Sequence, residues 1–175
     1  MSSIWKIIHT YFNDNHDWIV NHHLKSYNNF VYTQIPQIMR ENNPIPFMAE
    51  QDAKTKEYKY RCNLYLGGKD GKAIYYGKPV IYDSGGREHF MYPNEARLRN
   101  MTYACSIHYD VDIEITIHHE DGKDEKIEQK LSKIFLGRFP IMLQSKLCIL
   151  NGLDRGVRFN MGECKNDPGG YFIVD

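Results

Sequence analysis

The sequence predicts an α+β fold in which N-terminal helices are followed by a mostly antiparallel β-sheet. Apolar residues recur at helical spacing before residue 40, and the period changes to two after residue 57. The clearest alternation covers residues 103–118, where every odd position from Tyr103 to Ile117 is apolar or aromatic. We therefore expect one domain over residues 1–175, with residues 1–40 helical and residues 57–175 mainly β.

Two helices are predicted at the N-terminus. Ser3 is a suitable N-cap for a short helix that ends at the polar run 13–15. A second helix follows, because four apolar residues are spaced by four, three and four positions and so share one stripe: Val20, Leu24, Tyr27 and Val31. Pro36 lacks a backbone N–H, so we expect this helix to break near Ile35 and Pro36 to begin another short turn.

Period-two patterns predict the strands. Residues 58–66 alternate and end at a glycine-rich turn, and residues 74–82 form a second, weaker strand that contains Gly77 and Pro79. The long strand 103–118 is followed by a turn at 120–124 and a returning strand over 127–135. A last apolar strand is expected over 171–174.

Composition excludes several classes of protein. Lys plus Arg and Asp plus Glu each number 22, so the formal net charge is zero, whereas an independent nucleic-acid binder is usually strongly basic. Contact with nucleic acid would need a local patch that other chains help to complete. The four cysteines include no C-x-x-C pair, so we expect no zinc site. Neither a signal peptide nor an apolar run of ~18 residues is present, which favours an intracellular location.

One row of polar residues could suggest metal or acid–base chemistry. It comprises His108, Asp110, Asp112, Glu114 and His118. On a strand, successive side chains of one face lie ~7 Å apart, too far for neighbours to converge on one ion without a partner strand. We interpret the row as the solvated face of a strand, and a small metal-dependent hydrolase that uses it remains the third hypothesis for function.

Four stretches, in order along the chain, resemble the N-terminal part of the second-largest (beta-type) subunit of multisubunit DNA-directed RNA polymerases. The first runs from Trp18 to Val31 and contains Leu24-Lys25-Ser26-Tyr27-Asn28-Asn29-Phe30-Val31, and the second runs from Tyr92-Pro93-Asn94-Glu95 to Tyr103. The third, residues 137–148, is similar to the family's Gly-x-x-Pro-Ile-Met-Leu-x-Ser-x-x-Cys, with Gln144 where many relatives have Arg. The fourth is Gly162-Glu163-Cys164 with Asp167-Pro168-Gly169-Gly170-Tyr171-Phe172-Ile173.

The resemblance implies a role in transcription. In the family this region builds the first half of the protrusion, an α/β module beside the DNA cleft, so the fold expected here is protrusion-like and incomplete. The implied partners are other polymerase subunits, the remainder of the second-largest subunit, the DNA template and the RNA–DNA hybrid. The complete polymerase is a nucleotidyltransferase that uses Mg²⁺, whereas this segment is expected to be a non-catalytic fragment with no cofactor, no metal and no catalytic residue of its own.

Four cations are the candidates for contact with nucleic-acid phosphates, because Arg and Lys position the backbone without reading sequence: Arg97, Arg99, Arg138 and Lys146. Each also has a structural alternative, since most surface cations are solvated or paired with carboxylates. Arg97 and Arg99 in particular could brace the end of the long strand through Glu95 or Asp110.

An independent polymerase-like binding or assembly module without catalytic activity is the alternative function. An abundance of Asn, Ile, Lys and Tyr is typical of an AT-rich genome, such as that of a large DNA virus. The expected location is therefore the nucleus, or the cytoplasm or virion for a viral protein.

Overall fold

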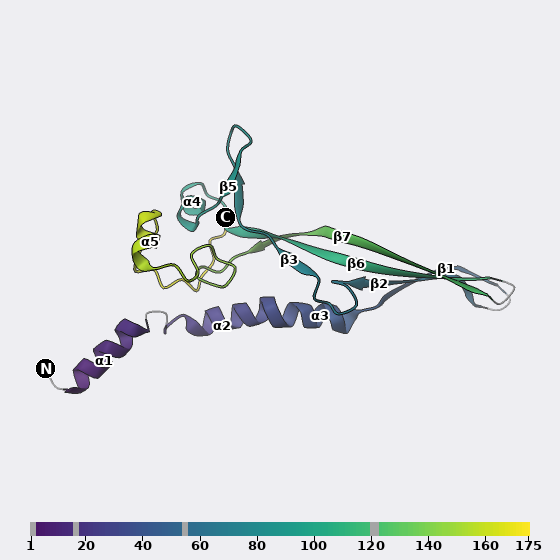
Figure 1. The fold of residues 1–175 in the computed structure, drawn as a ribbon, viewed down its shortest axis with the longest axis horizontal. Coiled ribbons are helices and arrows are strands. Elements are labelled where there is room, and N and C mark those ends of the chain that lie inside the picture. The colour runs from purple at the N-terminus through teal and green to yellow at the C-terminus, as the bar shows by residue number, and fades with distance from the viewer. Residues whose placement is uncertain (1–2, 16–17, 54–55, 120–122) are drawn as a thin grey trace. The chain divides into compact units, whose positions relative to one another are not determined.

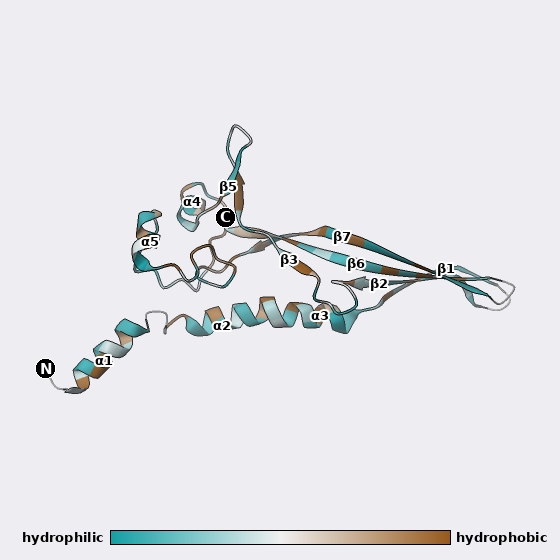
Figure 2. Cartoon of the chain, in the orientation of Figure 1, coloured by the Kyte–Doolittle hydropathy of each residue, from teal (hydrophilic) through white to brown (hydrophobic). Residues whose placement is uncertain are grey.

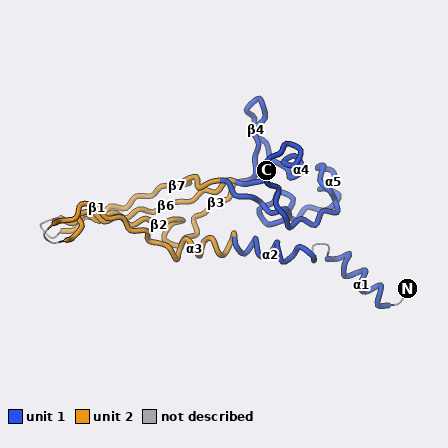
Figure 3. Tube along the Cα trace, turned by 180° about the vertical axis from the view of Figure 1, so that it is seen from behind, with its two compact units in different colours: residues 1–30, 78–105, 138–175 blue, residues 31–77, 106–137 orange. Residues whose placement is uncertain are grey.

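The computed structural model describes residues 3–15, 18–53, 56–119 and 123–175. The chain forms two compact units (Figure 3). Unit 1 contains residues 1–30, 78–105 and 138–175, and unit 2 contains residues 31–77 and 106–137. Each unit is therefore assembled from segments that are far apart in the sequence. In the described residues, no helix is long and apolar enough to cross a membrane.

The N-terminal helices occupy the predicted region, but their boundary at Pro36 differs from the prediction (Figure 1). Helix α1 spans Ser3–Asp14 and α2 spans Asn21–Asn29. Instead of breaking near Ile35, the chain passes through a π-helical turn, η1 (Phe30–Gln34), into α3 (Ile35–Asn42). Pro36 lies in the first turn of α3, so it begins a further helical segment as predicted, but the π-helical turn before it takes the place of the expected break.

The main sheet has five strands and lies largely in unit 2 (Figure 1). The strand order is β1 (Ile45–Gln51), β2 (Tyr58–Leu66), β6 (Ala104–His118) and β3 (Ile74–Tyr76), and β7 (Asp124–Pro140) also pairs with β6. The pairs β1–β2, β2–β6 and β3–β6 are antiparallel. The mostly antiparallel α+β prediction is confirmed, although β1 lies before residue 57, where the β region was expected to begin.

The predicted alternation explains the register of β2 on β6. Cys62 lies opposite Ile115, and Leu64 lies opposite Ile113. The apolar positions of both strands therefore share one face, as antiparallel pairing at this register requires. Figure 2 shows hydrophobic and hydrophilic residues alternating along β6. The turn expected at 120–124 falls mostly outside the described residues.

The single strand predicted over residues 74–82 is wrong. The segment is divided into β3 and β4 (Val80–Tyr82), and β4 pairs instead with β5 (Glu88–Phe90) in a separate two-stranded sheet. The break falls where the Gly77 N–H donates to the Ser106 carbonyl at 2.8 Å and where Pro79 has no N–H to continue the β3–β6 ladder.

In unit 2 the glycine-rich turn after β2 packs closely against α3. A Cβ on Gly71 would lie 2.7 Å from the Pro36 carbonyl oxygen, and the φ of Gly71 is +67°. The Asn43 side chain joins the same region, because it donates to the Leu66 carbonyl at 2.8 Å and accepts from the Leu66 N–H at 2.9 Å. The turn therefore tolerates only glycine at position 71.

The polar face of β6 is not uniformly solvated. Asp110 is 4% exposed, which corrects the expectation that the whole row from His108 to His118 is wet. Its carboxylate accepts from the Lys133 N–H at 2.9 Å and the Tyr75 hydroxyl at 3.1 Å, and it lies 3.4 Å from the Lys130 ammonium. Lys133 has a φ of +54°, a local irregularity of β7 that turns its N–H toward Asp110.

These contacts govern the charge of Asp110. The Lys133 N–H is the main cause that lowers the pKa of this carboxyl, and Tyr75 and Lys130 add to it. The carboxylate thus serves to hold β7 on β6. Across the residues that the structure describes, no three His, Cys, Asp or Glu side chains are grouped as a metal site would need.

The core of unit 1 includes Tyr103, Ile141, Leu143 and Met91, which are all fully buried. The expected strand over 171–174 is not formed. Instead, the C-terminal segment is held by isolated backbone bonds: the Tyr103 N–H donates to the Ile173 carbonyl at 3.0 Å, and the Leu143 N–H donates to the Tyr171 carbonyl at 2.9 Å. Because the segment bonds to two different chain stretches in turn, it builds no continuous ladder.

Candidate nucleic-acid interface and the polar network around it

The four predicted cations all lie in unit 1, but their surroundings differ. Arg97 and Arg99 lie within and just after helix α4 (Pro93–Leu98), which precedes β6. Arg138 is near the end of β7, and Lys146 is in the turn region that follows it. In the described part of the chain, no hydrogen bond or ion pair joins Arg97, Arg99 and Arg138 to one another.

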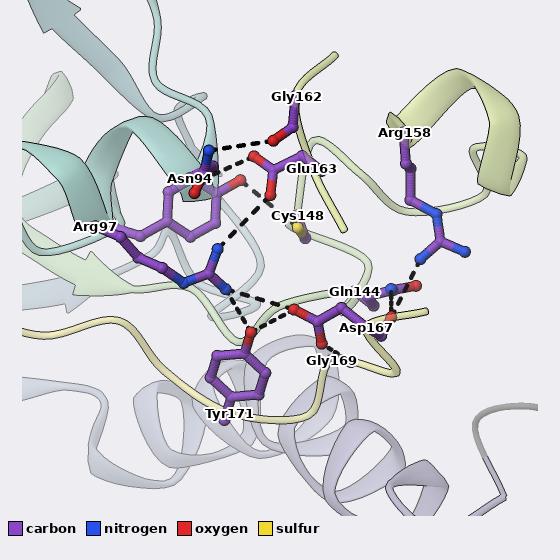
Figure 4. Close-up of polar contacts among 11 residues, drawn as sticks. Asn94, Arg97, Gln144, Cys148, Arg158, Gly162, Glu163, Asp167, Gly169 and Tyr171 are labelled. Atoms are coloured by element: carbon purple, nitrogen blue, oxygen red, sulfur yellow. Dashed lines mark hydrogen bonds and ion pairs between the residues drawn. The ribbon is translucent and has the colours of Figure 1, made fainter. Parts of the chain in front are cut away.

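Arg97 is the centre of an ion-pair network (Figure 4). Its guanidinium lies 3.7 Å from the Glu163 carboxylate and 3.5 Å from the Asp167 carboxylate. It also donates to the Tyr171 hydroxyl, which in turn donates to Asp167, and it lies over the Tyr171 ring at 5.7 Å from the centroid. Arg97 therefore joins α4 to the segment 163–171.

Glu163 caps helix α4 from a distant part of the chain. Its carboxylate accepts from the Asn94 backbone N–H at 2.8 Å, and the Asn94 side chain donates to the Gly162 carbonyl at 3.1 Å. Tyr92, the residue before the helix, offers no side-chain cap, so Glu163 satisfies a donor that would otherwise lack a partner. Burial raises the pKa of Glu163, while the Asn94 N–H and Arg97 act in the opposite direction.

Asp167 is the second hub of the network (Figure 4). One carboxylate oxygen accepts from the Gly169 N–H at 2.8 Å, and the other faces Arg97 and Tyr171. Its backbone carbonyl accepts from the Gln144 side chain at 2.6 Å and from Arg158 at 3.4 Å. Burial and the bond to Asp167 raise the pKa of Tyr171 to about 12, so the phenol stays protonated and continues to donate at neutral pH.

The turn after Asp167 requires glycine. Gly169 has a φ of +73°, and a Cβ there would lie 2.6 Å from the Leu143 carbonyl oxygen. The Gly170 N–H donates to the same carbonyl at 2.9 Å. This close approach brings the segment containing Asp167 against the residues that follow β7.

Arg99 matches one of its two structural alternatives. It forms an ion pair with Glu95 at 3.0 Å, one helical turn earlier, and its side chain is half exposed. Glu95 also accepts from His89 at 3.2 Å. Arg97, by contrast, pairs with Glu163 and Asp167 rather than with Glu95 or Asp110.

Arg138 and Lys146 are both exposed. The side chain of Arg138 has no hydrogen bond or ion pair to any described residue. The backbone N–H of Lys146 donates to the Asn28 side chain at 3.0 Å, which fixes this turn against α2. Nearby, the buried Tyr103 hydroxyl accepts from the Ile149 N–H at 3.2 Å and lies 3.6 Å from the Cys148 sulfur.

Sequence reasoning missed the partners of Arg97. Glu163 and Asp167 stand out only as members of a family-like stretch, and their spacing of four residues does not indicate that they converge on a cation 66 to 70 positions away. The pattern Asp-Pro-Gly-Gly does predict the local bond from the Gly169 N–H to the Asp167 side chain, since Asp commonly accepts from the N–H two residues on.

The comparisons with known proteins agree with the resemblance. A family model described as RNA polymerase beta subunit matches residues 18–175. The chain is 35% identical over 173 residues to the DNA-directed RNA polymerase subunit Rpo2N of Methanothermobacter thermautotrophicus, which covers 99% of this chain and 28% of that protein. It is 31% identical over 182 residues to the DNA-directed RNA polymerase II subunit RPB2 of Eremothecium gossypii, covering 98% of this chain and 14% of that protein.

A third relative is the DNA-directed RNA polymerase II subunit RPB2 of Encephalitozoon cuniculi, 36% identical over 174 residues, again with 98% of this chain and 14% of the relative covered. The chain thus spans less than a third of the length of these relatives. The predicted viral origin stays a prediction.

Proposed function

Because the chain belongs to the RNA polymerase beta subunit family, we propose that it acts as the N-terminal region of the second-largest subunit of a DNA-directed RNA polymerase. In this proposal the assembled enzyme is a nucleotidyltransferase that uses Mg²⁺, and other parts of the polymerase bind the metal. The segment itself contributes structure to the DNA cleft and to assembly with other subunits.

One observation carries this proposal. Three family-like stretches, distant in sequence, converge in unit 1: the Ile141 N–H donates to the Tyr103 carbonyl at 2.9 Å, and the Tyr103 N–H donates to the Ile173 carbonyl. Arg97 of the second stretch then pairs with Glu163 and Asp167 of the fourth. The residues that resemble the family are therefore those that hold one module together, which is the pattern expected of a scaffold.

The four cations differ in how easily they could bind a phosphate group. Arg138 and Lys146 are exposed and are our first candidates for facing the DNA template or the RNA–DNA hybrid. Arg97 and Arg99 would have to exchange or share their carboxylate partners to bind a phosphate, so we place them second. The proposed location is intracellular, in whichever compartment the polymerase works.

The test is recovery of the chain with an N-terminal affinity tag from its source cells, followed by an assay of templated RNA synthesis with Mg²⁺. We expect other polymerase subunits and synthesis activity to co-purify with the tagged chain and to be absent from an untagged control. A second preparation carrying Asp167→Ala should recover less of both. Tagged chain that is abundant and folded but free of polymerase subunits would favour the independent module instead.

A further inference from the structure

A groove of about 580 Å³ lies in unit 1, beside helix α5 (Arg155–Asn160), and cationic side chains dominate its lining. Arg155, Arg158 and Lys165 supply three positive charges, and the amides of Gln144, Asn151 and Asn166 supply further hydrogen-bond donors. None of these cations belongs to the set predicted from the sequence to face nucleic acid. The groove is therefore a separate feature of the unit.

Arg158 gives the groove a fixed donor. Its residue is 9% exposed, and one terminal nitrogen of its guanidinium donates to the Asp167 carbonyl at 3.4 Å (Figure 4). Its Nε is buried and has no hydrogen-bond partner in the described part of the chain. Buried donors are almost always satisfied, so Arg158 keeps unused hydrogen-bonding capacity beside the groove.

Of the two acidic residues of the lining, one carboxylate is already paired with groups outside the lining. Asp167 turns its carboxylate to Arg97, Tyr171 and the Gly169 N–H, and offers only its carbonyl to Arg158. Asp14 at the end of α1 is the other acid.

The remaining two cations are not neutralised. The side chain of Arg155 has no hydrogen bond or ion pair to a described residue. The Lys165 ammonium lies over the Phe159 ring at 5.7 Å from its centroid, and no carboxylate of the described residues pairs with it.

From this arrangement we propose that the groove binds a phosphate group through Arg155, Arg158 and Lys165. A phosphate offers several oxygens in a tetrahedral array, which suits two planar guanidinium groups and an ammonium, whereas a lone carboxylate is satisfied by one guanidinium fork. The proposal does not depend on the function proposed above, because it rests only on residues of this groove.

The test is a titration of the ¹⁵N-labelled 175-residue chain with inorganic phosphate and pyrophosphate at low ionic strength, followed by NMR of the arginine Nε–H signals. The Arg158 signal, assigned by its loss in Arg158→Lys, should shift and saturate. The double variant Arg155→Gln with Lys165→Gln should weaken binding at least about tenfold, since bonds between charged partners are the strong ones. Arg87→Gln, an exposed arginine on the β4–β5 turn, is the matched control and should change the affinity less than about twofold.

Two further ligands identify the source of the phosphate and challenge the proposal. A short oligothymidylate that binds more tightly than pyrophosphate would assign the site to a nucleic-acid strand, and weaker binding would assign it to a free phosphate compound. A folded chain whose Arg158 signal does not move, or equal weakening by Arg87→Gln, would overturn the proposal. So would a glutamate-rich peptide that displaces pyrophosphate at a lower concentration than any phosphate ligand, because the site would then select protein carboxylates.

Discussion

Glu163 and the Asn94 backbone N–H, 69 positions apart in the sequence, form a 2.8 Å hydrogen bond that caps helix α4. The same carboxylate is nearly buried and lies 3.7 Å from Arg97. A single side chain thus joins the segment before β6 to the segment after helix α5. This link is a structural one, and the effects of breaking it are measurable.

We expect Glu163→Ala to lower the free energy of unfolding by about 1–3 kcal/mol, because it leaves the Asn94 N–H without its acceptor and removes one of the two carboxylates that pair with Arg97. Denaturant unfolding at neutral pH measures the change. Glu88→Ala, at an exposed position of β5 in the same unit, is the control and should change the stability by less than about 0.5 kcal/mol. Equal effects of the two substitutions would show that the cap contributes nothing.

Gly169→Ala should destabilise the chain far more than Gly86→Ala. Both glycines have a φ of +73°, so both substitutions carry the same backbone strain of about 1 kcal/mol. A Cβ at Gly86 meets nothing within 4 Å, whereas at Gly169 it meets the Leu143 carbonyl oxygen at 2.6 Å. The difference between the two melting temperatures therefore isolates the steric collision, and similar values would contradict the packing of this turn.

The stability of the chain should depend on Asp110 at acidic pH. Its pKa is lowered in the folded state, chiefly by the Lys133 N–H, so its contribution is present above the ordinary pKa of an aspartate and is lost as the pH falls through the lower folded value. Unfolding measured between about pH 5 and pH 2 should show a steeper loss for the natural chain than for Asp110→Asn. Parallel pH profiles would mean that the carboxylate charge does not hold β7 on β6.

Duplex DNA should bind the isolated chain weakly and with strong salt dependence, because the net charge is zero and only local cations are available. We expect Arg138→Gln with Lys146→Gln to reduce the slope of log affinity against log salt by roughly one to two. Fluorescence anisotropy with a labelled duplex measures this slope, and Arg87→Gln serves as the control. An unchanged slope in the double variant would remove these two residues from the interface.

The isolated chain should incorporate no nucleotides on a primed template with Mg²⁺. The proposed function assigns catalysis to the assembled polymerase rather than to this segment. If the purified chain incorporated labelled nucleotide, and if this activity stayed with the chain through further purification steps, the segment would carry catalytic residues.

The sequence by itself determined the class of the fold and which side chains of its long strand share a face. Strict alternation along residues 104–118 fixes these faces, because a shift of one residue would exchange them. The partner strand and the opposition of Leu64 and Ile113 came from the tertiary structure, since alternation does not select a partner. The four family-like stretches could also be recognised from the sequence alone, because a motif consists of residues that are close together in the chain. The helical spacing before Pro36 was also sufficient to place α2.

The tertiary structure decided which hydrogen-bond and ion-pair partners the polar side chains have. From the sequence, Asp110 was one member of a solvated row, but in the structure it accepts hydrogen bonds from Lys133 and Tyr75. Arg97 was likewise a candidate surface cation, but in the structure it pairs with Glu163 and Asp167. Alternation and helical period report only on residues within a few positions of one another, whereas these bonds depend on chain segments brought together by folding. The charge and availability of each side chain were therefore set by long-range contacts, which local sequence pattern does not encode.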